Sequence, residues 1–178
     1  VIGIGGGSPM DAAKVIALLC TNDLDDKALF TGPYVRPLPI VTVPTTSGTG
    51  SEVTKVGVLT NPAAGTKQSV NTPLIFPVLS YADPSFTESV STTVTIDTAI
   101  DALSHAIEGY MSRKSTPMSD VWAEEAMRFP RSPSDGSGRK YPLCRPGRSD
   151  VRRDDCSIVI AQTGTTLVHG MGYSADLL

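Results

Sequence analysis

The sequence has few cysteines and no long hydrophobic run. Cys20, Cys144 and Cys156 are the three cysteines among 178 residues, and they show no C-x-x-C spacing. This argues against a disulfide framework and against a thiolate zinc site. No apolar stretch approaches the roughly 18 residues that cross a bilayer, and the N-terminal segment lacks the charged region of a signal peptide. We therefore expect a cytoplasmic protein with no membrane segment.

An excess of positive charge is also missing. Lys and Arg number 15 against 18 Asp and Glu, which gives a formal net charge of -3. The chain therefore has no overall attraction for the phosphates of nucleic acid, which is not an expected partner. Hydrophobic residues make up 40% and charged residues 19%, as in ordinary globular proteins, and the length suffices for one domain or two small ones.

Residues 129–156 differ in composition from the rest of the chain. They carry 7 Lys/Arg and 4 Asp/Glu, whereas residues 1–128 carry 8 and 13, and only six of these 28 residues are hydrophobic. Such a segment buries too little apolar surface to offset the entropy that ordering would cost. We predict an irregular segment, which is either a basic linker or a stretch that is not the native reading of its gene.

The first half of the chain alternates predicted strands with helices. Apolar strands bounded by Pro, Gly or Asn are expected at 1–4, 39–43, 53–60 and 78–81. A helix follows the first strand, since Ser8 is a preferred N-cap residue and Pro9 suits the first helical position. Asp11 is placed to accept a hydrogen bond from the N–H of that cap. Strands that alternate with helices favour an open parallel sheet and therefore an α/β fold.

Two polar turns follow predicted strands. The glycines at 5–7 would let a pyrophosphate approach the N–H groups and the positive dipole end of the helix, or they only permit a tight connection. The second turn, TTSGTGSE at 45–52, follows the strand 39–43 at the sheet edge where ligands bind in open α/β sheets. Its hydroxyls can donate to phosphate or ribose, or they can cap the turn itself.

A carboxylate and an imidazole share one face of a helix predicted at 97–111. Asp101 and His105 are four residues apart, so their side chains project from neighbouring turns and can hold one cation. Asp97 lies one turn earlier on the same line. The alternative is a hydrogen-bonded surface pair. His169 lies in an apolar segment, where a core histidine bonded to a backbone carbonyl is the alternative to a metal ligand.

These segments together resemble the iron-containing alcohol dehydrogenase family. The resemblance rests on GGGSPMDAAK (5–14), PTTSGTGSE (44–52), DPSFT (83–87), IDALSHAIEGY (100–110) and LVHGM (167–171). It implies an α/β fold in which a partial Rossmann-like dinucleotide-binding domain at 1–92 precedes part of an all-helical metal-binding domain at 93–128. The irregular segment 129–156 would then separate this domain from a partial helix at 157–178.

The resemblance also implies the residues of a cofactor and metal site. The metal would be divalent, with Fe²⁺ usual in the family and Zn²⁺ acceptable, and its ligands here would be Asp101, His105 and His169. Such a metal polarises an alcohol oxygen, while the nicotinamide of NAD or NADP accepts the hydride from the carbinol carbon. The residues that would contact the cofactor are Gly5, Gly6, Gly7, Ser8, Asp11, Thr45, Thr46, Thr49 and Lys67.

The sequence departs from the family pattern in three respects. Tyr173 stands where the family often has a histidine that relays protons. The family's fourth metal ligand and the first strands of its nucleotide domain have no counterpart here. The family has helices with apolar stripes where this sequence reads 129–156, which suggests a frame shift in that segment.

The expected function is the oxidation of a primary alcohol to an aldehyde with NAD or NADP. Two alternatives stay open, namely an inactive fragment of the family and a relative that resembles glycerol dehydrogenase. The sequence does not indicate whether the chain forms a homo-oligomer.

Overall fold

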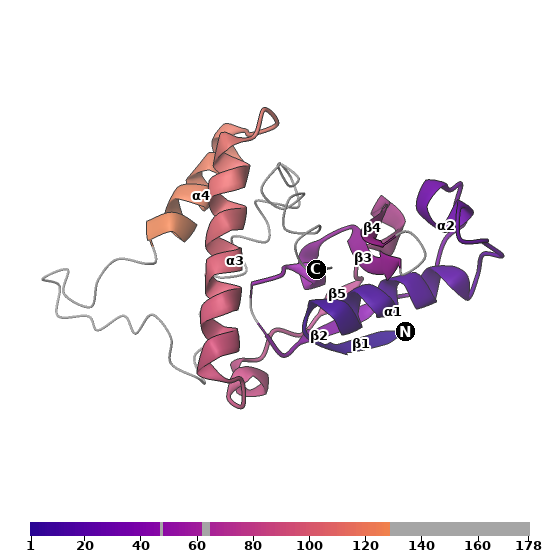
Figure 1. Cartoon of the computed structure of the whole chain (residues 1–178), viewed down its shortest axis with the longest axis horizontal. Helices are drawn as coiled ribbons and strands as arrows, with labels where there is room; N and C mark the ends of the chain where they lie inside the picture. Colours follow the sequence, from indigo (N-terminus) through magenta and orange to yellow (C-terminus); the bar gives the residue numbers. More distant parts are fainter. Residues whose placement is uncertain (47, 62–64, 129–178) are drawn as a thin grey trace, which may run out of the picture. The chain divides into compact units, whose positions relative to one another are not determined.

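The computed structural model describes residues 1–46, 48–61 and 65–128, and these residues form two compact units (Figure 1). The first unit comprises Val1–Thr45 and Gly50–Ala82, and the second comprises Thr46–Thr49 and the described residues from Asp83 onward. None of the described helices combines the length and hydropathy that crossing a bilayer requires. The domain boundary predicted after residue 92 stays a prediction, and the predicted segments 129–156 and 157–178 lie outside the described residues.

A parallel sheet of three strands forms the centre of the first unit. In sheet order the strands are β1 (Ile2–Gly5), β2 (Val41–Pro44) and β5 (Leu79–Ser80). Gly5 lies opposite Pro44, and Thr42 lies opposite Ser80. Three of the four predicted strands lie in this sheet, and their parallel pairing confirms the expected α/β arrangement.

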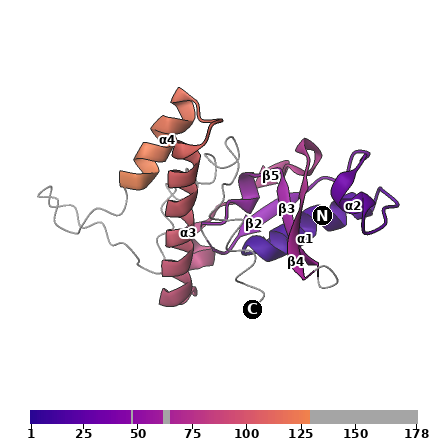
Figure 2. The ribbon, with the colours of Figure 1, turned by 45° about the horizontal axis from the view of Figure 1, so that its top comes forward.

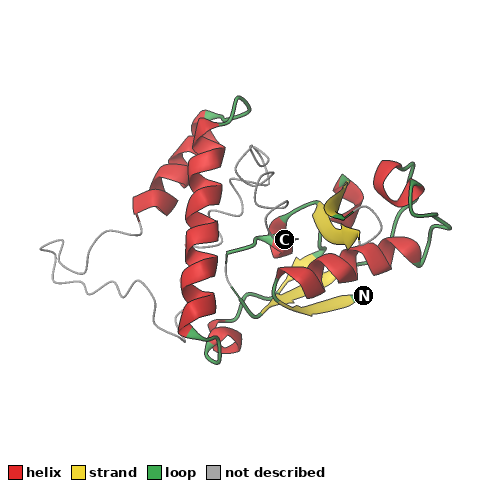
Figure 3. Ribbon diagram, in the orientation of Figure 1, coloured by secondary structure: helices red, strands yellow, loops and turns green. Residues whose placement is uncertain are grey.

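Helix α1 (Gly7–Leu19) packs against β1 (Figure 3). A Cβ atom at Gly3 would lie 2.8 Å from Cβ of Ala13 and 3.2 Å from Cα of Met10, so glycine permits the close approach of helix and strand. A core of apolar side chains fills this unit, and its buried members are Val15, Ala17, Leu18, Ile40, Val70 and Ile75.

The predicted cap of α1 is wrong. The N-cap residue is Gly6, in an extended conformation and without a side-chain cap, so the helix begins at Gly7 and Ser8 lies inside its first turn. The carboxylate of Asp11 does not close a capping box, because it accepts hydrogen bonds from Ser51 and from the N–H of Val58. Contacts with residues distant in the sequence have replaced the local ones.

The third predicted strand lies outside the parallel sheet. It forms β3 (Val56–Asn61), which pairs antiparallel with β4 (Thr66–Asn71) in a separate two-stranded sheet. Gly65, just before β4, has a φ of +59°, which is the left-handed region that glycine adopts without strain. The expectation of one open sheet is therefore wrong for this strand. Three shorter elements complete the unit, namely α2 (Ala28–Thr31) and the 3₁₀ turns η1 (Ser51–Val53) and η2 (Pro73–Ile75).

The second unit is helical. After the short turn η3 (Pro84–Thr87), helix α3 (Thr92–Met111) packs against α4 (Pro117–Arg128), and the two helices lie side by side in both views (Figures 1 and 2). Small side chains at the contact, Ala102, Ala106 and Ala126, are buried and allow the helices to approach closely. Helix α3 begins five residues before the predicted start, because Ser91 accepts a hydrogen bond from the N–H of Val94 and caps it.

Candidate cofactor and metal site

The glycine turn ends β1 and opens α1. Gly5 has a φ of +143°, and a Cβ atom there would lie 2.7 Å from Cγ of Pro9, so neither the backbone nor the space accommodates another residue. No side chain caps the first turn of α1. A helix start without a side-chain cap presents N–H groups and a positive dipole end, which together suit a phosphate group.

The second polar turn begins beside the glycine turn. The backbone N–H of Thr45 donates to the carbonyl oxygen of Gly5 at 2.9 Å. Both residues lie at the carboxyl ends of neighbouring parallel strands, which is where open α/β sheets bind nucleotides. The structure therefore brings Gly5 and Thr45, two of the predicted cofactor residues, together. Lys67 lies on β4 opposite Thr60 and is partly buried.

The rest of the second turn packs within the other unit. Thr46 and Thr49 belong to the same unit as α3. Gly48 has a φ of +132°, and a Cβ atom there would overlap the carbonyl oxygen of Thr98 on α3. Oγ1 of Thr49 is buried and has no hydrogen-bond partner within the described part of the chain. A predicted cofactor segment thus touches the helix that carries the predicted metal ligands.

Asp101 and His105 face each other across one turn of α3. Oδ1 of Asp101 lies 3.8 Å from Nε2 of His105. That separation is longer than a hydrogen bond, and it is close to the ~3.4 Å expected between an oxygen and a nitrogen that share a tetrahedral cation at about 2.1 Å from each. The imidazole is buried, with 5% of the residue exposed, whereas 37% of the Asp101 side chain is exposed. The pair therefore fits a divalent metal in donor type and spacing.

Two ligands alone do not make a complete metal site. Among residues 1–46, 48–61 and 65–128, no group of three His, Cys, Asp or Glu side chains converges on one point. His169, the third predicted ligand, lies outside the described residues. Asp97, one turn before Asp101, is exposed.

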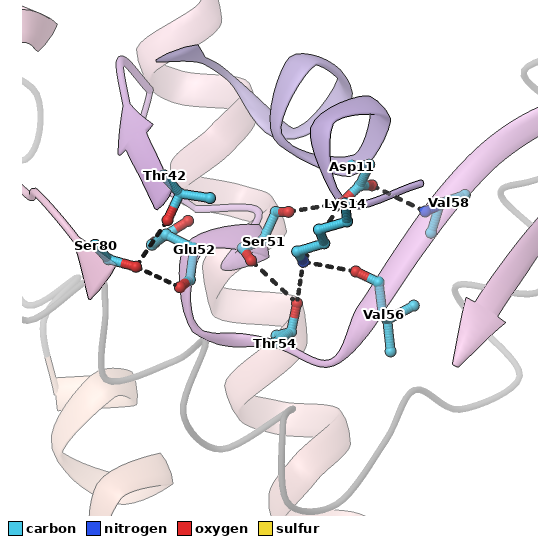
Figure 4. Close-up of polar contacts among 9 residues, drawn as sticks. All are labelled: Asp11, Lys14, Thr42, Ser51, Glu52, Thr54, Val56, Val58 and Ser80. Carbon is cyan, nitrogen blue, oxygen red and sulfur yellow. Dashed lines mark hydrogen bonds and ion pairs between the residues drawn. The ribbon is translucent and has the colours of Figure 1, made fainter. Parts of the chain in front are cut away.

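Sequence reasoning missed a buried lysine close to the glycine turn. Lys14 on α1 is fully buried, and its Nζ donates to the carbonyl oxygen of Val56 at 2.7 Å and to Oγ1 of Thr54 at 3.3 Å (Figure 4). Oδ1 of Asp11 lies 3.7 Å from the same atom. Burial lowers the pKa of Lys14 from 10.5 to about 8, and it outweighs the opposing effects of Asp11 and Glu52. A charged residue among apolar neighbours at 13, 15, 17 and 18 was the available signal.

A parallel sheet with a glycine turn at its carboxyl edge is typical of α/β folds that bind nucleotides. The profile described as iron-containing alcohol dehydrogenase matches residues 1–84, and the profile described as Fe-containing alcohol dehydrogenase family, C-terminal, matches residues 95–129. The chain belongs to the iron-containing alcohol dehydrogenase family. This confirms the predicted family and fold class, a partial Rossmann-like domain followed by a helical part.

Individual relatives agree with this assignment. The chain is 45% identical over 125 residues to the probable alcohol dehydrogenase EutG of Salmonella typhimurium, covering 69% of this chain and 32% of that protein. It is 38% identical over 131 residues to the NAD-dependent methanol dehydrogenase of Bacillus methanolicus, covering 72% and 34%. The crystal structure of an iron-containing alcohol dehydrogenase of Thermotoga maritima matches with a TM-score of 0.85 and 45% identity, over 99% of this chain and 49% of that one. The chain thus spans about a third of these curated relatives' length and half of that structure's.

Proposed function

We propose that this chain carries part of the site of an alcohol dehydrogenase that oxidises a primary alcohol to an aldehyde with NAD or NADP. The observation that carries the proposal is the Asp101–His105 pair, 3.8 Å apart, on a helix that Gly48 of the second cofactor turn touches. The loop proposed to contact the cofactor thus touches the helix proposed to hold the metal. Relatives named as an alcohol dehydrogenase and as an NAD-dependent methanol dehydrogenase support the substrate class.

The chain's own residues bind and orient the dinucleotide in this proposal. The turn Gly5–Gly7 and Ser8 would receive the pyrophosphate at the start of α1. Thr45, hydrogen-bonded to Gly5, would line the same edge of the sheet, and Thr46, Thr49 and Lys67 would contact the remainder of the cofactor. The bound nicotinamide supplies the hydride acceptor, and the protein determines which face the substrate reaches.

The metal would be held by Asp101 and His105, with His169 as a further proposed ligand. A divalent cation supplies a Lewis acid that polarises the alcohol oxygen and lowers its pKa. One carboxylate and neutral imidazoles suit both Fe²⁺ and Zn²⁺. Burial of His105 surrounds its ring with protein atoms, which would limit the orientations available to a ligand.

Metal retention tests the proposal without relying on turnover. The wild-type chain, loaded with Fe²⁺ or Zn²⁺ and desalted, should retain about one equivalent by elemental analysis, and Asp101→Ala should lose it because one of the ligands is gone. Asp97→Ala is the matched control, since it removes an exposed carboxylate one turn away on the same helix. Equal retention by all three proteins would contradict the assignment of Asp101.

A non-catalytic product is the second candidate. The chain covers 32% of one curated relative and 34% of another. A polypeptide that binds NADH or NADPH but neither retains metal nor oxidises any primary alcohol would support this candidate. Metal-dependent turnover would exclude it.

A further inference from the structure

Both ends of the loop 46–49 are attached to the unit that holds the glycine turn. Before the loop, the N–H of Thr45 donates to the carbonyl oxygen of Gly5 at 2.9 Å. After the loop, Ser51 begins η1, and its Oγ donates to Oδ1 of Asp11 at 2.6 Å. The chain on either side of the second cofactor loop is therefore hydrogen-bonded to the strand–turn–helix segment that carries the glycine turn.

The turn η1 is also bonded to the parallel sheet. Oγ of Ser80 on β5 donates to the carbonyl oxygen of Glu52 at 2.6 Å, and it lies 2.7 Å from Oγ1 of Thr42 on β2 (Figure 4). Thr42 is fully buried. Hydrogen bonds from α1 and from the sheet thus hold η1 from two sides.

The side chain of Lys14 contacts the residues that follow η1 in the chain. Its ammonium bonds to Thr54 and to the backbone of Val56, and it lies beside Asp11. Removing an ammonium from water has a large free-energy cost, and a methionine of similar volume would fill the same space without that cost. Unlike methionine, lysine donates hydrogen bonds, and these bonds hold the backbone from 54 to 56 in one position against α1.

We propose that Lys14 is a positioning residue for the dinucleotide. Acting through Asp11, Thr54 and Val56, it fixes the chain that follows the second cofactor loop relative to the glycine turn. Its side chain is fully buried, so its effect reaches the cofactor through the protein. Within the first unit, the segments that would contact the cofactor, Gly5–Gly7 and Thr45, bind best when they are ordered beforehand, because any ordering left until binding weakens the affinity. The inference rests on the proposed function, which assigns both turns to one dinucleotide.

A fluorescence titration with NADH and NADPH tests the role of Lys14. Lys14→Met should raise the Kd on the order of tenfold, which corresponds to the loss of one charge-assisted hydrogen bond, and the binding stoichiometry should not change. Thr54→Val removes one acceptor of the same ammonium, and a smaller increase of Kd is expected. Lys27→Met is the matched control, because Lys27 is an exposed lysine of the same unit, and its Kd should equal that of the wild type.

The stoichiometry separates positioning from a purely structural role. If Lys14 only stabilised the fold, part of the Lys14→Met protein would be unfolded and would not bind. The folded molecules would bind with the wild-type Kd, so the stoichiometry would fall while the Kd stayed unchanged. Should circular dichroism show that Lys14→Met does not fold, Thr54→Val decides alone, and an unchanged Kd there overturns the inference. If the wild type binds NADH or NADPH, and Lys14→Met and Thr54→Val bind it with the wild-type Kd, the inference is overturned and the proposed function stands. Absence of NADH and NADPH binding by the wild type would refute the proposed function and this inference with it.

Discussion

Burial of Lys14 makes the stability of the protein depend on pH in the alkaline range. The pKa of Lys14 is about 8 in the folded chain and 10.5 when the side chain is exposed to water. Between these two values, the unfolded chain holds a proton at Lys14 that the folded chain has lost. Because stability rises with pH wherever the unfolded state binds more protons, Lys14 should stabilise the fold progressively from about pH 8 to about 10.5. Below pH 8 both states are protonated, and the contribution of Lys14 is constant.

The magnitude follows from the size of the pKa shift. The shift from 10.5 to about 8 is worth about 3 kcal/mol at ~1.4 kcal/mol per pH unit. Other lysines, tyrosines and cysteines also titrate in this range, so the informative quantity is the free energy of unfolding of the wild type minus that of Lys14→Met. This difference should rise by about 3 kcal/mol across the interval.

Urea unfolding at several pH values between 7 and 11 measures this difference. The same substitution at the exposed Lys27 is the control, and it should leave the pH dependence as in the wild type. A flat difference for Lys14→Met would show that the folded chain does not desolvate this ammonium. A falling difference would show that its carboxylate neighbours, Asp11 and Glu52, outweigh burial.

Two further predictions concern the local packing and capping. Gly3→Ala should destabilise the chain by about 1–3 kcal/mol in urea unfolding, because the new Cβ would lie 2.8 Å from Cβ of Ala13. Gly57→Ala is the control and should destabilise the chain less, because its Cβ would meet only ordinary contacts at 3.4 Å and beyond. Equal losses of stability in the two variants would contradict this packing. Ser91→Ala should lower the thermal stability by about 1 kcal/mol because it removes the cap of α3, whereas Ser91→Asp should keep it; an equal loss in both variants would argue against the cap.

The sequence predicted best what depends on local spacing. Asp101 and His105 face each other because residues four apart on a helix lie on neighbouring turns, whatever packs around them. Gly5 and Thr45 meet because Gly5 ends β1 and Thr45 directly follows β2, and parallel strands end at the same edge of a sheet. The family resemblance rests on the segments that contain these residues, and the matched family profiles cover them.

Features that depend on distant contacts were not predictable from spacing. The sequence predicted a capping box between Ser8 and Asp11. In the structure Asp11 instead accepts a hydrogen bond from Ser51, which is 40 residues away. The hairpin was missed because β4 reads TKQSVN, with Val70 as its one fully buried residue, and so shows little apolar alternation. The apolar neighbours of Lys14 indicated its burial, but its acceptors, Thr54 and Val56, could not be identified because they come from a different part of the chain.

The most direct test of the dehydrogenase assignment is alcohol-dependent reduction of NAD⁺ or NADP⁺ by the chain, measured before and after chelation and after readdition of Fe²⁺ or Zn²⁺. We predict turnover of a primary alcohol that disappears with the metal, returns with it, and is lost in His105→Ala. Turnover that survives both chelation and His105→Ala would contradict a metal held by Asp101 and His105, and absence of turnover in the metal-loaded wild type would contradict the activity proposed for this chain.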